Sequence, residues 1–406
     1  MRKVSTRDEV HSDGIARPVR GPRKGMMWYR PCLLCLVLLA MLLTPTWSGD
    51  ASSSRPKKFL LLQSDTRNLE SNVETARYHS LTAVINFIYT KLHSADYLYF
   101  VFNQSRAEFL SDANVMFRAE FRNSSLQQST EISGTYEKKG PSCYHPVLRQ
   151  FRAAPWTKLL ALWNVSQSNL ASRYSHILFL DSDAVVNPKF HHQSLFDKLH
   201  GWSTLRCHSS RAHKNDMTRP DQSAAIFLDN SPFVPYQGHL CDGAFVLNLG
   251  FEGVAYEPYA AATSRSDEKG ASFIANFLKE WWDNDVESKD FNHWWHHDAT
   301  NKNFNHAYEQ DSLWNQLYNP RTSWRINANT VCVVPEPQFP PSKNESLWVL
   351  HVGSPWEIDR LTILRTLVDQ MRLSSDDFAK MIEYISRFAS VSGSAAEIGQ
   401  KMSECA

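Results

Sequence analysis

The stretch Tyr174–Pro188, which reads YSHILFLDSDAVVNP, is the most informative part of the chain. Its apolar run 176–180 has the length and composition of a buried β-strand, and this strand would end directly at an Asp-Ser-Asp sequence. In an open α/β sheet, ligands bind beyond the carboxyl ends of the strands. Because side chains two residues apart on an extended backbone point the same way, Asp181 and Asp183 are predicted to share one ligand.

The predicted ligand of Asp181 and Asp183 is a divalent cation. Carboxylate oxygens suit Mn²⁺ or Mg²⁺, and such a cation can bridge the two phosphates of a nucleotide-sugar and neutralise the charge of the leaving diphosphate. A solvated turn is the alternative interpretation, since Asp-x-Asp occurs in many surface loops. The apolar strand before the two carboxylates and the AVVNP sequence after them favour the cation.

Strand-like and helix-like segments alternate on both sides of this stretch. The pattern before it predicts strands at 59–63 and 97–102 and helices at 72–92 and 156–163. Such alternation is typical of an α/β domain, so we expect a Rossmann-like, mostly parallel central sheet flanked by helices. Beyond the stretch we expect a long loop, a strand, two helices, a short strand, a helix and a loose tail, at 203–240, 244–248, 272–283, 310–317, 347–351, 361–388 and 391–406.

The N-terminal part has the features of a membrane-targeting segment. Residues 1–30 carry eight Lys or Arg against three acids, so the rest of a chain of net charge +1 is slightly acidic, which disfavours a nucleic-acid-binding role. The apolar residues that follow predict a cytosolic tail at 1–30, a signal-anchor at 31–47 and a stem at 48–57. A cleaved signal peptide is the alternative. Either segment would place the remainder in the secretory lumen.

Two further features agree with a lumenal location, in the Golgi or the ER. Four Asn-x-Ser sequons are present, at Asn103, Asn123, Asn164 and Asn344. Behind the apolar segment lie five cysteines, at 143, 207, 241, 332 and 405, so one or two disulfides are expected, with at least one thiol left over. The pairing is not predicted.

Several blocks of the chain, in their order, resemble glycosyltransferase family 34, which includes fungal α-galactosyltransferases, mannan-synthesis subunits and plant xyloglucan xylosyltransferases. The blocks are PWTKLL at 155–160, LDSDA at 180–184, DGAFVLN at 242–248 with the Trp-containing segment 277–282, EQDSL at 309–313 and HVG at 351–353. The chain departs from the family at Asp242, where Asn is usual, at Leu249 and Gly250, and in an apparent insertion at 253–271. The resemblance implies a GT-A catalytic domain over 58–390.

The resemblance also implies roles for residues outside the Asp-Ser-Asp sequence. His351 would be the third metal ligand, with a hydrogen-bonded strand-end histidine as the alternative. Gln310 and Asp311 would lie near the anomeric carbon, or else cap a helix. Asp242 would bind sugar hydroxyls, or else occupy a turn before a strand.

The remaining candidates concern the nucleotide, the phosphates and the acceptor. Lys158 would contact phosphate or face solvent, and Gln63, Ser64 and Asp65 would bind the base or form an ordinary turn. The segment 291–298, FNHWWHHD, is interpreted as an acceptor-sugar groove or as ordinary packing rather than a second metal site, because neighbouring side chains diverge.

These features predict a metal-dependent glycosyltransferase that moves galactose, xylose or mannose from a nucleotide-sugar to a glycan or glycoprotein acceptor. Transfer with retention of anomeric configuration follows from the resemblance. A homo- or hetero-oligomeric assembly is compatible with the sequence. The alternatives are a non-catalytic glycan-binding scaffold on the same fold and, disfavoured by the lack of Gly-x-Ser-x-Gly and His-Glu-x-x-His sequences, a lumenal hydrolase.

Overall fold

The computed structural model describes eleven segments of the chain, which are residues 58–102, 143–148, 150–152, 154–207, 219–229, 240–251, 271–284, 309–318, 330–337, 347–352 and 357–404. Contacts divide the chain into Met1–Thr44 and Pro45–Ala406, and all described residues belong to the second unit. The predicted tail, signal-anchor and stem therefore lie outside the described residues, as do the segment 291–298 and most of the predicted insertion. None of the described helices is both long enough and apolar enough to cross a membrane.

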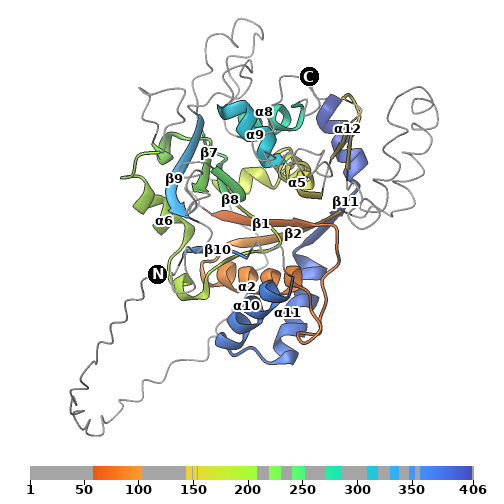
Figure 1. Ribbon diagram of the computed structural model, residues 1–406, viewed down its shortest axis with the longest axis vertical. Coiled ribbons are helices and arrows are strands. Elements are labelled where there is room, and N and C mark those ends of the chain that lie inside the picture. The colour runs from red at the N-terminus through yellow and green to blue at the C-terminus, as the bar shows by residue number, and fades with distance from the viewer. Residues whose placement is uncertain are drawn as a thin grey trace, which may run out of the picture. The chain divides into compact units, whose positions relative to one another are not determined.

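A seven-stranded sheet forms the centre of the second unit, in the order β11-β2-β1-β5-β8-β7-β9 (Figure 1). Every neighbouring pair is parallel except the two pairs that β8 makes with β5 and β7, so β8 alone runs against the others. The strands are β1 (Phe59–Asp65), β2 (Asp96–Phe102), β5 (His176–Leu180), β7 (Ala225–Asp229), β8 (Leu240–Asn248), β9 (Val331–Pro337) and β11 (Ser390–Gly393).

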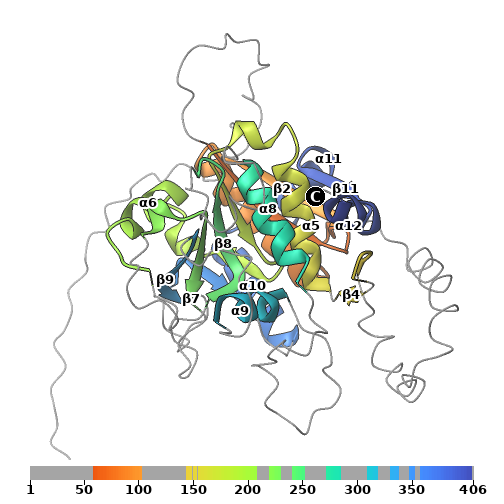
Figure 2. The ribbon, with the colours of Figure 1, turned by 90° about the horizontal axis from the view of Figure 1, so that it is seen from above.

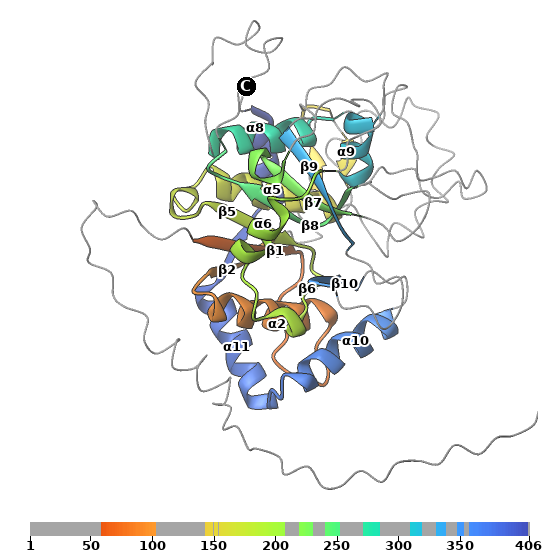
Figure 3. The ribbon, with the colours of Figure 1, turned by 90° about the vertical axis from the view of Figure 1, so that its left-hand side faces the viewer.

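Helices cover both faces of this sheet (Figures 1 and 3). One face carries α2 (Tyr78–Leu92), α10 (Glu357–Gln370) and α11 (Ser375–Phe388), and the other carries α5 (Thr157–Ser166), α8 (Ala271–Trp282), α9 (Glu309–Tyr318) and α12 (Ala395–Glu404). The expectation of a mostly parallel sheet flanked by helices is therefore confirmed. Two small antiparallel ladders accompany it, β6 (Ala184–Val186) with β10 (Val349–His351) and β3 (Cys143–His145) with β4 (Gln150–Arg152).

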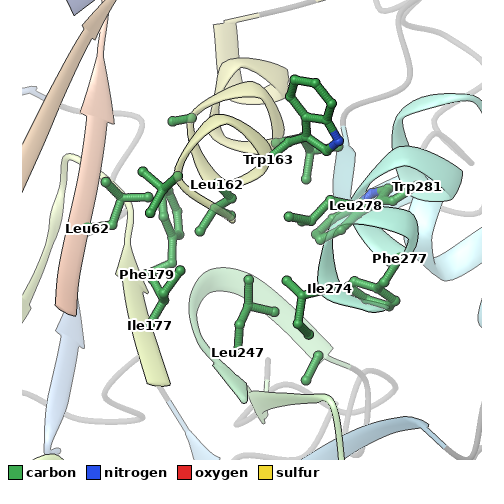
Figure 4. Packing of buried hydrophobic residues seen from close by; sticks show 14 of the residues in the cluster. Leu62, Leu162, Trp163, Ile177, Phe179, Leu247, Ile274, Phe277, Leu278 and Trp281 are labelled. Atoms are coloured by element: carbon green, nitrogen blue, oxygen red, sulfur yellow. The ribbon is translucent and has the colours of Figure 1, made fainter. Parts of the chain in front are cut away.

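The core on the α5 and α8 face consists of large apolar side chains. Helices α5 and α8 lie side by side over the strands (Figure 2). Leu162 and Leu278 point from these helices toward Ile177, Phe179 and Leu247 of β5 and β8 (Figure 4), and all five are essentially inaccessible to solvent. Burial of such a side chain contributes about 1.5–3 kcal/mol, so this packing holds β5, and with it the Asp-Ser-Asp sequence, in place.

Several sequence predictions differ from the structure in the C-terminal part. The helix expected over 361–388 is two helices, because Arg372 adopts a left-handed φ of 56° and Ser374 caps α11 by accepting a hydrogen bond from Asp377. The prediction of a loose tail at 391–406 is wrong, since β11 pairs with β2 and α12 follows it. Strand β7 lies inside the predicted loop 203–240 and β9 was not predicted. Strand β7 pairs with β8 and β9, and this pairing between distant segments is not visible in the local sequence pattern.

The cysteines and one sequon have defined places. Cys207 and Cys332 form a disulfide that joins the segment after α6 (Leu195–Trp202) to β9, while Cys241 is a buried cysteine outside this disulfide. Asn164 lies within α5, and its sequon residue Ser166 is buried, so this sequon does not lie in an exposed loop. The other three sequons lie outside the described residues.

Candidate metal centre

The Asp-Ser-Asp sequence forms a tight turn between β5 and β6. The Asp181 N–H donates to the Gly243 carbonyl of β8 at 2.8 Å, and the Ala184 N–H donates to the Asp181 carbonyl at 2.9 Å. The first bond continues the β5–β8 ladder for one residue, and the second closes a four-residue turn. Both carboxylates are thereby fixed at the carboxyl end of a central strand, where the sequence predicts a ligand site.

Two buried polar residues of α2 hold the other side of this turn. Thr82 donates to the Ser182 carbonyl at 2.8 Å. Asn86 donates to the Ala184 carbonyl at 3.0 Å and accepts from the Val186 N–H at 2.9 Å. Thr82 and Asn86 are four residues apart, so they lie on the same face of the helix. Sequence analysis missed both residues, although two polar side chains at this spacing in a largely apolar helix are a usable signal.

His351 reaches Asp183 through the small β6–β10 ladder. The register places His351 opposite Ala184, one residue after Asp183, and the Val352 N–H donates to the Asp183 carbonyl at 2.9 Å. His351 Nε2 then lies 3.0 Å from Asp183 Oδ1. One ligand atom from each of Asp181, Asp183 and His351 falls within a set whose members all lie within 4.8 Å of one another. Two carboxylates and an imidazole are a donor set that fits Mn²⁺, and with added oxygen ligands Mg²⁺.

The electrostatics of Asp183 and His351 favour strong pairing. Burial alone would raise the pKa of Asp183, but His351, Arg360 and Lys158 together lower it to about 2. Burial would lower the pKa of His351, but the charge and hydrogen bond of Asp183 raise it well above 6.5. A metal ligand must be the neutral imidazole, so a cation that binds here displaces the proton of His351.

The ring of His351 packs directly on the backbone of β8. A Cβ placed on Gly243 would lie 2.3 Å and 2.4 Å from the Cε1 and Nδ1 atoms of His351. Cys241 Sγ lies 3.9 Å from the same Nδ1, and burial raises the pKa of its thiol, which therefore stays neutral. The Cys241-Asp242-Gly243 segment thus fixes the ring orientation, and glycine is needed because a side chain would occupy the space of the imidazole.

Lys158 brings the predicted sugar-binding residue Asp242 next to the metal ligands. Its ammonium lies 2.9 Å from Asp181 Oδ1 and 3.5 Å from Asp242 Oδ1, and the side chain is only 2% exposed. The alternative that Lys158 faces solvent is therefore wrong. Asp242 lies inside β8 rather than in a turn before the strand, and its N–H donates to Gln310 Oε1 at 3.2 Å. The structure therefore brings together Lys158, Asp242, Gln310 and the three candidate metal ligands, while the side chain of Asp311 lies outside the described residues.

Gln63 and Asp65 lie within the last residues of β1 rather than in a turn after it, and they have two different environments. Gln63 is fully buried, and its amide donates to the Asp181 carbonyl at 3.0 Å and accepts from Tyr97, so it supports the turn. Asp65 forms two hydrogen bonds with the Arg67 guanidinium, at 2.8 Å and 2.6 Å. Burial would raise the pKa of Asp65, but Arg67, with help from the Ser182 hydroxyl, holds it below its ordinary value. A contact of Gln63 or Asp65 with a nucleotide base remains a prediction.

Arg360 of α10 is a site residue that the sequence did not indicate. Its Nη1 lies 3.3 Å from Asp183 Oδ2, and its guanidinium carbon lies 4.5 Å from the centre of the Tyr78 ring. Arg67 lies over the same ring at 4.6 Å and donates to the Tyr78 hydroxyl. One arginine on an amphipathic helix gives no recognisable signal, and the contact depends on how α10 packs beside α2 (Figure 3).

Comparison with known proteins adds little to this geometry. No family model matches the chain, and no curated protein matches it. Among solved structures the chain is similar to a glycosyltransferase involved in the glycosylation of the major capsid of PBCV-1, with 10% identity over 76% of this chain and 99% of that chain and a TM-score of 0.37. A likeness at this level carries no argument about function, which rests on the site itself.

Proposed function

We propose that this chain binds a nucleoside diphosphate through a divalent cation held by Asp181, Asp183 and His351. The observation that carries this proposal is the convergence of these three residues at the carboxyl end of β5, in a mostly parallel sheet. More specifically, the protein is a GT-A glycosyltransferase that transfers galactose, xylose or mannose from a nucleotide-sugar to a glycan acceptor. The resemblance of the sequence blocks to glycosyltransferase family 34 supports this narrower assignment.

The described residues would have separate roles in such a transfer. Bound Mn²⁺ or Mg²⁺ would stabilise the negative charge of the leaving diphosphate. Lys158 keeps Asp181 and Asp242 close together, and Gln310 fixes the backbone of Asp242, so that the Asp242 carboxylate can be oriented toward sugar hydroxyls. Transfer with retention needs no strong protein base, because the leaving phosphate can accept the proton of the acceptor hydroxyl.

The proposed location is the Golgi or ER lumen, with a single N-terminal signal-anchor. The basic residues before the apolar segment 31–47 and the sequons support it. The Cys207–Cys332 disulfide supports it as well, because disulfides form and persist in oxidising compartments such as the secretory lumen. Microsomes in which residues 58–406 are accessible to protease without detergent would contradict this location.

The test of the function is donor turnover by the full-length protein in detergent, across UDP-galactose, UDP-xylose and GDP-mannose, with and without Mn²⁺. We expect Mn²⁺-dependent hydrolysis or transfer with one donor, and loss of that activity in Asp183→Asn. Asp369→Asn, which removes an exposed carboxylate from α10, is the control and should retain activity. A folded protein that binds none of the donors would contradict the transferase assignment and favour the glycan-binding scaffold.

A further inference from the structure

We propose that Arg360 binds the donor diphosphate and that it changes partner, from Asp183 to a phosphate oxygen, when the divalent cation binds. This inference rests on the proposed function and adds to it a residue and an order of binding. The order is cation first and nucleoside diphosphate second. Three observations carry it, and they concern the contact with Asp183, the stack on Tyr78 and the contrast with Lys158.

Asp183 uses its two carboxylate oxygens for two different groups. Oδ1 accepts from His351, the candidate ligand beside it, while Oδ2 lies 3.3 Å from Arg360 Nη1. A divalent cation bound by Asp183 draws the charge of this carboxylate toward itself, so the attraction between Asp183 and Arg360 weakens. The cation and Arg360 therefore compete for Asp183, and binding of the cation leaves a guanidinium with a weakened partner at the edge of the metal centre.

The Tyr78 stack keeps Arg360 in position when its pairing with Asp183 weakens. The Arg360 guanidinium lies over the Tyr78 ring at 4.5 Å, a contact that does not require Asp183. Arg67 lies over the same ring, but its charge is already paired with Asp65 through two short hydrogen bonds. Of the two arginines at Tyr78, Arg360 is therefore the one that contacts a candidate metal ligand.

Arg360 is also more accessible to a ligand than Lys158, which is another cationic side chain described at the metal centre. The Lys158 side chain is 2% exposed and lies between Asp181 and Asp242, whereas the Arg360 side chain is 16% exposed. A guanidinium stays charged at every physiological pH and can bind a phosphate through two parallel hydrogen bonds. Arg360 thus has the charge, the geometry and the access that a metal-bound diphosphate requires.

The test measures two affinities of the full-length protein, one for Mn²⁺ alone and one for UDP and GDP at saturating Mn²⁺. In Arg360→Gln the guanidinium that competes with Mn²⁺ for Asp183 is lost, so we expect the affinity for Mn²⁺ alone to rise about twofold to fivefold. We expect the affinity for the bound nucleoside diphosphate to fall about tenfold or more. Uridine and guanosine, which lack phosphate, should bind the variant and the wild type equally, and Arg365→Gln, an exposed arginine of the same helix, should change neither affinity.

The opposite directions of the two changes separate this role from a structural one. A merely structural role would lower both affinities together, and that result would overturn the inference, as would an unchanged affinity for the diphosphates. Arg360→Lys keeps the positive charge but lacks the planar guanidinium that donates two parallel hydrogen bonds. Its Mn²⁺ affinity should therefore stay near the wild-type value, and its diphosphate affinity should lie between those of the wild type and Arg360→Gln. If the wild type binds no Mn²⁺, or if Asp183→Asn binds it equally well, the proposed metal centre itself fails.

Discussion

The two carboxylates of the Asp-Ser-Asp sequence have different surroundings. Asp181 pairs on the α5 side with Lys158, whose side chain is only 2% exposed, although the Asp181 carboxylate itself is 26% exposed. Asp183 pairs with His351 and Arg360 on the α2 and α10 side, where the partners are more accessible. The difference lies in the partners, and we expect from it that the buried Lys158 fixes the geometry of the site and that the more accessible Arg360 exchanges its partner when a ligand binds. Each prediction below tests one side of this division.

The largest expected effect is on the Asp181 side, in Lys158→Met. This change leaves Asp181 and Asp242 facing each other without the ammonium between them. Loss of one partner from a buried ion pair costs about 3–5 kcal/mol, so the free energy of unfolding should fall by about that amount. Denaturant unfolding measures it, with the exposed Lys380→Met of α11 as the control. Unchanged stability would show that Lys158 does not serve a structural purpose.

At His351, the partner of Asp183, Gly243→Ala should impair metal binding more than folding. The new Cβ would lie 2.3 Å from the Cε1 atom of His351, so the imidazole must shift from its position beside Asp183. Displacement of a group that orients a metal ligand typically lowers affinity about tenfold to a hundredfold. Titration with Mn²⁺ measures the change. Gly201→Ala is the control, because a Cβ there meets no atom within 4 Å, and equal Mn²⁺ affinities in both variants would contradict the prediction.

A smaller effect is expected in Asn86→Ala, which removes the helix side chain that holds the backbone after the Asp-Ser-Asp sequence. The Ala184 carbonyl and the Val186 N–H would each lose the bond to Asn86. A buried backbone group without a partner costs about 1–3 kcal/mol, and we expect a loss of about 2 kcal/mol in unfolding free energy. Gln370→Ala, at the exposed end of α10, should be neutral in the same measurement.

The smallest effect concerns Arg67→Gln and depends on pH. The pKa of Asp65 is lowered in the folded protein, so its pairing stabilises the fold above the ordinary value of 3.8, and this contribution is lost as the pH falls through the lowered pKa. Near pH 7 the variant should be less stable by about 1 kcal/mol, since Arg67 is one-third exposed. The difference should disappear in strong acid. Arg77→Gln, whose partner Glu70 is exposed, should show a smaller difference at every pH.

The sequence was most informative where structure is local. Strand β5 was predicted with its observed bounds, because five apolar residues before Asp181 need no distant partner to be recognised. The same holds for the positions of α5 and α8, which differ from the predicted helices by only a few residues. By contrast, β11 has the polar sequence SVSG and exists only because β2 offers it a parallel edge.

The candidate site divides in the same way. Asp181 and Asp183 follow from the end of one strand, whereas His351 was expected only from a family resemblance, because its contact depends on the pairing of β10 with β6. Arg360 carried no signal, since it is a charged residue on a helix, and Gly243 was quoted only as part of the block 242–248, because its importance depends on a ring from a different segment. Non-local packing, which periodicity does not encode, accounts for these omissions.

The pairing of β11 with β2 has a consequence for how the chain is made. Ser390 lies opposite Tyr99 in this ladder. The outer edge of β2 therefore stays without its partner strand until a segment almost three hundred residues later has been synthesised. Contacts between such distant segments form slowly, and an unpaired strand edge invites association with other chains. Residues 351 and 360 are also synthesised long after β2, so the proposed metal centre can form only once they have been made. Cation binding would therefore distinguish chains that have been synthesised through β10 and α10 from shorter ones. Chains interrupted before β10 should accumulate as aggregation-prone species that bind no metal.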